Sequence, residues 1–362
     1  MLNLDYQRDK IFESKKHIIE DLFKGDRDIL IFGITNYTEP LINFLKEKGL
    51  IIKGIIDDYT EKERIFDIKI LRSDQIDKNN IVISSIIEGR PKSVRNLLLN
   101  KGVNDLLDYF DFNYMYPNLF QIPFNSGNRE KILNNQSELQ FVADKLQDDL
   151  SKKFFQEVID FRLNFNYWNK CFIYSPENQY FELFFNFENI FSFIDAGGYD
   201  GETTLNAFNK FRNLNKVIFI EPFPESMKLA KEKMSVLHND KISFIETAIS
   251  DHNTVKYITT HKGNANHLID YGELTIRVSK LDEIVNEKID FIKLDIEGEE
   301  LKALKGAENL IKKFKPYIAC CVYHDQNHFW QIPLFLLKIN PGYKIYFSHY
   351  TEGICESVMY FI

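Results

Sequence analysis

The chain is poor in cysteine, in long apolar runs and in positive charge, and each shortage excludes a class of protein. Its four cysteines include no C-x-x-C pair, which excludes a disulfide scaffold and a structural zinc site. No window reaches the ~18 apolar residues of a membrane-spanning helix, and the N-terminus has no apolar stretch of signal-peptide length. The 45 Lys and Arg against 53 Asp and Glu give a net charge of −8, too acidic for a protein that neutralises nucleic-acid phosphates. We therefore expect a soluble, cytoplasmic protein that binds neither membranes nor nucleic acid.

Apolar and aromatic residues, by contrast, are abundant. Hydrophobic residues make up 44% of the chain and aromatic residues 14%, which excludes disorder and supplies a large core. At roughly 150 residues per domain, 362 residues correspond to about two domains. We divide the chain into a degenerate Rossmann-like α/β domain at 1–112, a helical connector at 113–190 and a second α/β domain at 191–362.

Strand and helix patterns alternate in both outer zones, which indicates βαβ units and parallel sheets. In the first zone we expect strands at 28–33, 51–56 and 81–84, and helices at 40–48 and 94–99. Helical periodicity covers 130–166 in the connector. In the third zone we expect strands at 191–195, 217–221, 242–246, 289–295, 317–322, 343–349 and 357–362, and a hairpin that pairs Lys256–Thr260 with Thr275–Val278. The sequence thus predicts two separate sheets joined by helices.

The stretch Asp195-Ala-Gly-Gly-Tyr-Asp-Gly201 lies directly after a predicted strand and before a predicted helix. Glycines there let the backbone turn sharply and approach a ligand, and the helix start offers free N–H groups. The next strand ends at Glu221, 20 residues after Gly201, where a carboxylate can accept both hydroxyls of a ribose. A tight turn with a solvated acid would explain either feature alone, but the joint arrangement favours a nucleoside-containing cofactor.

The loop favours S-adenosylmethionine (SAM) over a dinucleotide. A dinucleotide loop has the pattern G-x-G-x-x-G, whereas this loop carries acids at Asp195 and Asp200, which would repel a pyrophosphate. SAM has a sulfonium, an amino group and no phosphate, so acids suit it. In the first zone, Gly33 begins a similar turn and Asp57 occupies the ribose-acid place, but the second glycine is absent. We expect that domain to serve packing, dimerisation or recognition of a nucleotide-sugar handle.

Polar side chains end the later strands of the third zone. Asp295 and Glu297 follow one strand, Tyr323 and His324 the next, and His349 ends a third. Ligands bind at this edge of open α/β sheets. A histidine there could deprotonate a hydroxyl. Alternatively, three of these side chains together with His328 could hold a divalent metal, which we do not favour: Asp295, Glu297, His324 and His328.

Four motifs together resemble the FkbM-type SAM-dependent methyltransferases over 191–362. They are the loop 195–201, Glu221-Pro, Lys293-Leu-Asp295-Ile-Glu297-Gly298 and Leu304-Lys-Gly306-Ala. Further motifs are similar to a bacterial subgroup associated with surface-polysaccharide gene sets: Tyr323-His324, Trp330-Gln-Ile-Pro333, Ser348-His349-Tyr350 and Glu356-Ser-Val-Met-Tyr360.

This resemblance implies a class I methyltransferase fold with a seven-stranded Rossmann-like sheet whose last strand is antiparallel. It implies O-methylation, commonly of a sugar or natural-product hydroxyl. It places the glycine loop at the methionine end of SAM, Glu221 at its ribose and 246–248 beside its adenine. The cofactor-binding residues expected are Asp195, Gly197, Gly198, Tyr199, Gly201, Thr203, Glu221, Pro222, Thr247 and Ala248. The catalytic residues expected are His324 or His349 as the base, with Asp295 orienting the base or the substrate.

The favoured hypothesis is a SAM-dependent O-methyltransferase that acts on a nucleotide-activated sugar or another precursor of a capsule or surface polysaccharide. Two alternatives stay open. One is NAD(P)-dependent sugar oxidation or epimerisation on the N-terminal sheet, which lacks a complete glycine fingerprint. The other is a non-catalytic scaffold that binds SAM or a nucleotide sugar. The sequence does not decide the oligomeric state, and a homo-oligomer stays open.

Overall fold

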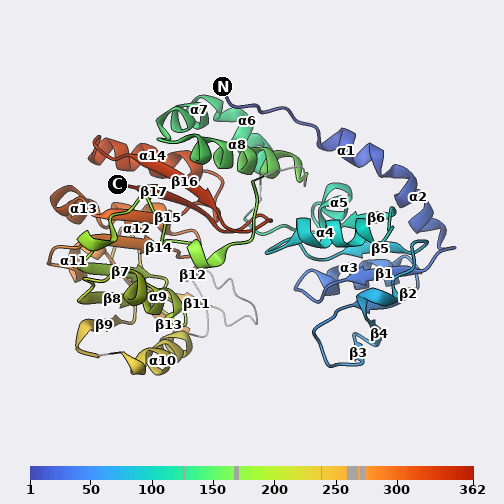
Figure 1. Ribbon diagram of the computed structural model, residues 1–362, viewed down its shortest axis with the longest axis horizontal. Coiled ribbons are helices and arrows are strands. Elements are labelled where there is room, and N and C mark those ends of the chain that lie inside the picture. Colours follow the sequence, from blue (N-terminus) through green and yellow to red (C-terminus); the bar gives the residue numbers. More distant parts are fainter. Residues whose placement is uncertain (125–126, 167–170, 238, 259–267, 270–273) are drawn as a thin grey trace.

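The protein is described by a computed structural model that covers residues 1–124, 127–166, 171–237, 239–258, 268–269 and 274–362. Two sheets lie side by side, the N-terminal one in blue and cyan and the C-terminal one in yellow to red (Figure 1). Each sheet carries helices on its faces, as βαβ units require. Within the described ranges, every helix is too short or too polar to cross a lipid bilayer.

The N-terminal sheet has the strand order β3-β4-β2-β1-β5-β6, and only β3 runs antiparallel. Its strands are β1 Ile29–Phe32, β2 Ile52–Ile56, β3 Arg64–Ile65, β4 Ile68–Leu71, β5 Ile81–Ser84 and β6 Leu106–Asp108. Its helices are α1 Arg8–Ser14, α2 Lys16–Lys24, α3 Thr38–Glu47, α4 Pro91–Asn100 and α5 Tyr109–Met115. The predicted strands and helices of this zone are confirmed, while β3, β4 and β6 were not predicted.

The connector forms three helices where the sequence predicted one helical stretch: α6 Asn128–Asn134, α7 Gln136–Lys145 and α8 Asp149–Asn164. The chain is extended at Leu146, which pairs with Ile345 of the C-terminal sheet. Asp148 then caps α8, since its carboxylate accepts a hydrogen bond from the Ser151 N–H at 2.6 Å. Helix α8 packs against β16 and α7 against α14, so the connector covers one flank of the C-terminal sheet.

The C-terminal sheet has seven strands in the order β16-β17-β15-β14-β7-β8-β9, and β17 is antiparallel to both neighbours. This arrangement is consistent with the class I methyltransferase fold. All seven predicted strands are confirmed: β7 Ser192–Ala196, β8 Lys216–Ile220, β9 Ile242–Ile245, β14 Phe291–Leu294, β15 Tyr317–Cys321, β16 Ile345–His349 and β17 Ser357–Phe361. The accompanying helices are α9 Glu202–Lys210, α10 Pro224–Lys233, α11 Leu281–Ile284, α12 Glu300–Lys305, α13 Glu308–Phe314 and α14 His328–Ile339.

A small sheet of order β10-β13-β11-β12 lies beyond β9. Its strands are β10 Ala248–Ile249, β11 Thr254–Ile258, β12 Leu268–Ile269 and β13 Leu274–Ser279. The predicted hairpin is confirmed in the pairs Lys256 with Ile276 and Tyr257 with Thr275. Its residues 259 and 260 lie outside the described residues. Short 3-10 helices complete the chain: η1 Ser73–Gln75, η2 Pro176–Asn178, η3 Phe187–Asn189, η4 Met234–Val236 and η5 Asn239–Lys241.

A continuous apolar cluster joins the N-terminal sheet, the connector and one face of the C-terminal sheet. The two sheets also touch through polar groups between β16 and β17. The Glu352 carboxylate there accepts hydrogen bonds from the Ser93 N–H at 2.7 Å and the Ser93 hydroxyl at 2.6 Å, at the start of α4. A Cβ on Gly353 would lie 2.3 Å from the Ile87 carbonyl oxygen, so the contact is close.

Candidate active site

The glycine loop between β7 and α9 has the backbone that glycine permits. Gly197 and Gly201 have φ values of 74° and 83°. A Cβ on Gly197 would lie 1.8 Å from the Asp295 carbonyl oxygen, and one on Gly198 would lie 2.1 Å from the Phe219 ring. The loop therefore packs directly on the neighbouring strands. Tyr199, at its tip, has a φ of 50° and a side chain that is exposed.

Asp195 is fully buried beneath this loop. Its carboxylate accepts a hydrogen bond from the Thr204 hydroxyl at 2.7 Å and lies 3.1 Å from the Lys293 Nζ. Lys293 also donates to the Gly197 carbonyl at 2.6 Å. Burial alone would lower the pKa of Lys293, but the charges of Asp195 and Asp295 outweigh it and raise the pKa. The structure thus places Asp195 in a buried ion pair that fixes the shape of the loop.

Glu221 follows β8 and faces the loop. Its carboxylate accepts hydrogen bonds from the backbone N–H groups of Tyr199 and Phe223, each at 3.0 Å. Burial raises the pKa of Glu221 to about 7, against the opposing effect of these N–H groups. A carboxylate has about four acceptor positions, so two remain for ribose hydroxyls.

The other expected cofactor positions lie along the same edge. Thr203 is half-buried in the first turn of α9, and Pro222 is half-buried after Glu221. The Thr247 hydroxyl is buried and donates to the Arg277 carbonyl at 3.0 Å, and Ala248 begins β10. Thr247 and Ala248 therefore follow β9, the strand next to β8.

Asp295 follows β14 directly, and three side chains converge on its carboxylate. The Tyr180 hydroxyl donates to one oxygen at 2.9 Å, and the Tyr323 hydroxyl donates to the other at 3.4 Å. The His324 Nε2 lies 3.6 Å from that second oxygen. Tyr323 also donates to Glu356 at 3.3 Å. The ends of β14 and β15 thus meet, as adjacent parallel strands require.

A strained turn follows Asp295. Glu297 has a φ of 56°, rare for a residue with a side chain, and Gly298 has a φ of 101°. The turn wraps the buried Glu300 carboxylate, which accepts the N–H groups of Ile296 at 3.0 Å and Gly298 at 3.3 Å. Burial and the nearby acids raise the pKa of Glu297 to about 7, although His324 opposes the shift.

His324 lies between these acids with 1% of its side chain exposed. Its Nδ1 is 2.7 Å from Glu300, and its Nε2 is 3.6 Å from Glu297 and has no hydrogen-bond partner among the described residues. Burial favours the neutral ring, but Glu300 and the other carboxylates outweigh it and raise the pKa of His324 to about 9. Conversely, the two histidines His324 and His328 outweigh burial and hold the pKa of Glu300 far below its usual range.

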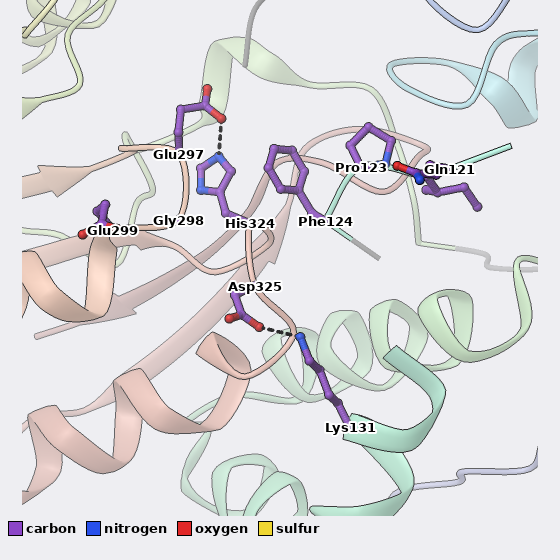
Figure 2. A pocket seen from close by; sticks show the side chains of 10 residues that line it. Gln121, Pro123, Phe124, Lys131, Glu297, Gly298, Glu299, His324 and Asp325 are labelled. Atoms are coloured by element: carbon purple, nitrogen blue, oxygen red, sulfur yellow. Dashed lines mark hydrogen bonds and ion pairs between the residues drawn. The ribbon is translucent and has the colours of Figure 1, made fainter. Parts of the chain in front are cut away.

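A cavity of about 490 Å³ opens beside this cluster. Figure 2 shows Phe124 beside the His324 ring with Pro123 beyond it, Glu297 above His324 and Lys131 paired with Asp325. The lining residues come from the connector and from the loops after β14 and β15: Gln121, Ile122, Pro123, Phe124, Lys131, Glu297, Gly298, Glu299, His324 and Asp325.

The structure does not bring His349 into this cluster. Its ring is buried, its Nδ1 lies 2.9 Å from the Ser357 hydroxyl, and its ring centre lies 4.2 Å from that of Phe172. Burial and the positive charge of Arg162 lower the pKa of His349 to about 3. So acidic a conjugate acid makes His349 a poor proton acceptor at neutral pH.

The donor set could also hold a divalent cation. Asp295, Glu300 and His324 each offer one ligand atom within 4.8 Å of the others. His324 precedes α14, which begins at His328, so the two histidines do not share a helix; His328 instead faces the second Glu300 oxygen at 3.3 Å. Because Glu300 already binds His324 and two backbone N–H groups, it is better suited to orient the ring than to bind a metal.

Sequence reasoning missed Tyr180, Glu300 and Glu356 as site residues. Tyr180 comes from the connector, where it was one of several aromatic residues. Glu300 is one of several acids in 297–300, and only the course of the turn shows that it is the buried one. Glu356 was part of a motif but was assigned no role, although it has a φ of 67° and hydrogen-bonds to Tyr323. Tyr180 and Glu356 share a positive φ, a signal that only the structure supplies.

The N-terminal sheet is closed where a dinucleotide would bind. A Cβ on Gly33 would lie 2.3 Å from the Ile86 side chain, so that side chain occupies the approach. The Asp57 carboxylate accepts the N–H groups of Tyr59 at 2.9 Å and Thr60 at 2.7 Å within its own turn.

Comparison with known protein families gives a match in the part of the chain that forms the C-terminal sheet. Residues 195–347 match the methyltransferase FkbM domain family. The methyltransferase FkbM of Methylobacillus flagellatus has the same fold, with a TM-score of 0.73, 19% sequence identity and coverage of 98% of this chain and 99% of that chain. Comparison with curated sequences gave no match.

Two further solved structures resemble about half of the chain. The O-methyltransferase of Bacillus cereus in complex with SAH has 14% identity and a TM-score of 0.34 over 62% of this chain and 97% of that one. The precorrin-6y C5,15-methyltransferase of Geobacter metallireducens has 12% identity and a TM-score of 0.30 over 48% of this chain and 79% of that one. The family match covers residues 195–347, so this part of the chain is similar to the methyltransferase FkbM domain, and the structural match shows that the chain shares the fold of an FkbM methyltransferase.

Proposed function

We propose that the protein transfers the methyl group of SAM to a hydroxyl of a carbohydrate, and that 191–362 is the catalytic domain, 113–190 the connector and 1–112 a Rossmann-like domain with another role. The observation that carries the proposal is the meeting of two half-sites on adjacent strands. The glycine loop and Glu221 form one half, and Asp295 and His324 form the other.

The residues of the first half fit SAM. The loop packs so closely on β14 and β8 that side chains at Gly197 and Gly198 would collide with them, and Glu221 supplies a buried carboxylate for ribose. When bound, SAM supplies a methyl group that its sulfonium already activates. The protein then has to position the acceptor oxygen and remove its proton.

His324 is the base that we assign. Its unpartnered Nε2 accepts the hydroxyl proton, while Glu300 holds the Nδ1 side and fixes the ring. The acceptor oxygen bonds to the methyl carbon as the carbon–sulfur bond breaks, and the proton leaves on the imidazole. His324 must be neutral to act, and its pKa in the free protein is about 9. We therefore expect kcat/KM to rise with pH towards that value.

Carbohydrate is the acceptor class that we favour. The cavity combines the apolar faces of Phe124 and Pro123 with amide and charged groups at Gln121, Glu297 and Lys131. A sugar ring presents both an apolar CH face and hydroxyls, so such a mixed lining suits it. The resemblance of the motifs to a surface-polysaccharide subgroup points to a nucleotide-activated sugar or a capsule precursor.

Turnover with labelled SAM and a panel of sugars and nucleotide sugars tests this function. The product should gain the mass of one methylene group and carry the label. His324→Ala should retain SAM binding and lose turnover. Binding of SAM without turnover of any sugar would favour a scaffold, and full activity of His324→Ala would remove that base. A parallel reaction with a chelator tests the cation alternative.

A further inference from the structure

Three segments that form the acceptor side of the site meet at one buried side chain, Arg162 of α8. It is 3% exposed. Its Nη2 donates to the Tyr323 carbonyl at 2.7 Å and to the Ile354 carbonyl at 3.0 Å. Its Nη1 donates to the Phe124 carbonyl at 3.3 Å. A fourth contact, at 3.4 Å, joins Nη1 to the Gln326 side chain.

Each of these segments supplies a residue of the site. Phe124 is itself a wall of the cavity, and Tyr323 precedes His324. Ile354 lies two residues before Glu356, which hydrogen-bonds to Tyr323. The segments come from the connector and from the loops after β15 and β16, so no single secondary structure element fixes their spacing. The guanidinium donates to a backbone carbonyl of all three.

Arg162 has no carboxylate within ion-pair distance in the part of the chain that the structure describes. Burial lowers its pKa to about 10, so it stays protonated at neutral pH. A buried cation without a counter-ion is costly, and an apolar side chain of similar length would avoid that cost. It would also leave the three carbonyls unpaired and the segments untied. What the guanidinium adds is therefore a fixed geometry.

We propose that Arg162 is a positioning residue of the acceptor site, which sets the spacing between the Phe124 wall, His324 and Glu356. This inference rests on the proposed function only for its kinetic readout. The cofactor half, built on the loop 195–201 and Glu221, has no contact with Arg162 among the described hydrogen bonds, so its ligand affinity should be independent of this side chain.

Arg162→Met tests the proposal, with Arg8→Met as the matched control. Arg8 also donates from a half-buried guanidinium to a backbone carbonyl, that of Phe110 at 3.0 Å, and its described hydrogen bonds reach no residue that lines the cavity. In Arg162→Met we expect kcat/KM for the active sugar to fall by at least about tenfold while the Kd of SAM changes by less than about twofold. Arg8→Met should lose thermal stability without this kinetic change. Arg162→Lys, which keeps the charge but not the fork, should lie between wild type and Arg162→Met.

Side-chain NMR of labelled histidine gives a readout that needs no sugar. The His324 resonances should shift in Arg162→Met, whereas those of the exposed His252 should not. Unchanged kinetics and an unmoved His324 signal would overturn the proposal, and so would an equal loss of SAM affinity. If Arg162→Met does not fold, the Arg162→Lys variant decides by the same two measurements. If the wild type methylates no sugar, the proposed function fails while the NMR comparison still decides the role of Arg162.

Discussion

The N-terminal and C-terminal sheets share a glycine after their first strand and a carboxylate after their second strand, but these residues make different contacts in the two sheets. In each, a glycine with positive φ follows the first strand, Gly33 in one and Gly197 in the other. In each, a carboxylate follows the second strand. Asp57 turns back to cap its own turn, whereas Glu221 reaches across to the loop after the first strand and accepts the Tyr199 N–H.

The difference shows why a glycine and an acid at the right spacing do not by themselves make a cofactor site. In the N-terminal sheet the Ile86 side chain fills the approach to Gly33, and in the C-terminal sheet the backbone of Asp295 closes on Gly197. The second arrangement brings two strands and a loop together around a buried acid. The first is a packed turn.

The largest effect that separates the two sheets should come from adding one methyl group to each glycine. Gly197→Ala combines a positive φ with a Cβ 1.8 Å from a backbone oxygen that cannot move aside. We expect a loss of at least about 4 kcal/mol in the free energy of unfolding, or no folded protein. Gly33→Ala meets only a flexible side chain and should cost about 1–2 kcal/mol. Chemical denaturation measures both, and equal losses would contradict the comparison.

The next largest effect that we expect is a pH dependence of the free energy of unfolding, which arises from His324 in the C-terminal site. His324 has a folded-state pKa of about 9, above the unfolded value near 6.5. Its contribution is therefore fully present below pH 6.5 and is lost as the pH rises through 9. The shift corresponds to about 3 kcal/mol at most. We expect the free energies of unfolding of chelator-treated wild type and His324→Asn to differ below pH 9 and to converge above it. Parallel curves of this free energy against pH would refute the raised pKa of His324.

Glu221 and Asp57, the carboxylates that follow the second strand of each sheet, should differ in their effect on SAM affinity. Glu221→Gln removes the charge that we assign to the ribose, and we expect SAM affinity to fall by about 10- to 100-fold. Asp57→Asn should leave SAM affinity within about twofold, since no ligand role is assigned to that acid. Isothermal titration calorimetry checks both. A comparable loss in Asp57→Asn would mean that the N-terminal sheet takes part in cofactor binding.

The smallest effect that we expect is the change in melting temperature on addition of NAD, the ligand that would bind the N-terminal sheet. A ligand that binds the native state raises the melting temperature by mass action, and SAM should do so. Millimolar NAD should leave the melting temperature unchanged, because Ile86 and the Asp57 turn occupy its place. A clear shift that Gly33→Ala abolishes would instead support the oxidoreductase alternative.

The C-terminal strands could be predicted from sequence because buried parallel strands appear as short apolar runs bounded by turns. β3 and β6, at two and three residues, are too short to show a period. The connector was harder, since its break at Leu146 depends on pairing with Ile345, which lies far away in the chain.

The sequence predicts those residues of the candidate site whose position follows from the end of the strand before them. Asp295 and His324 follow adjacent strands, and the structure brings the Asp295 carboxylate and the His324 Nε2 to 3.6 Å. His349 also ends a strand, but Phe172 from the connector covers its ring. Tyr180 and Glu356 enter through loops whose course depends on tertiary contacts such as that of Arg162 with Ile354. No local pattern contains that information.

The buried Lys293 has a consequence for the distance between the two reactants. It holds the glycine loop through Asp195 and the Gly197 carbonyl, and Asp295, two residues further along the same chain segment, belongs to the cluster that we assign to the acceptor. Two residues of extended chain span about 6.6 Å. If the proposed function holds, this segment fixes the spacing between methyl donor and acceptor, and the two could be aligned without one domain closing on the other.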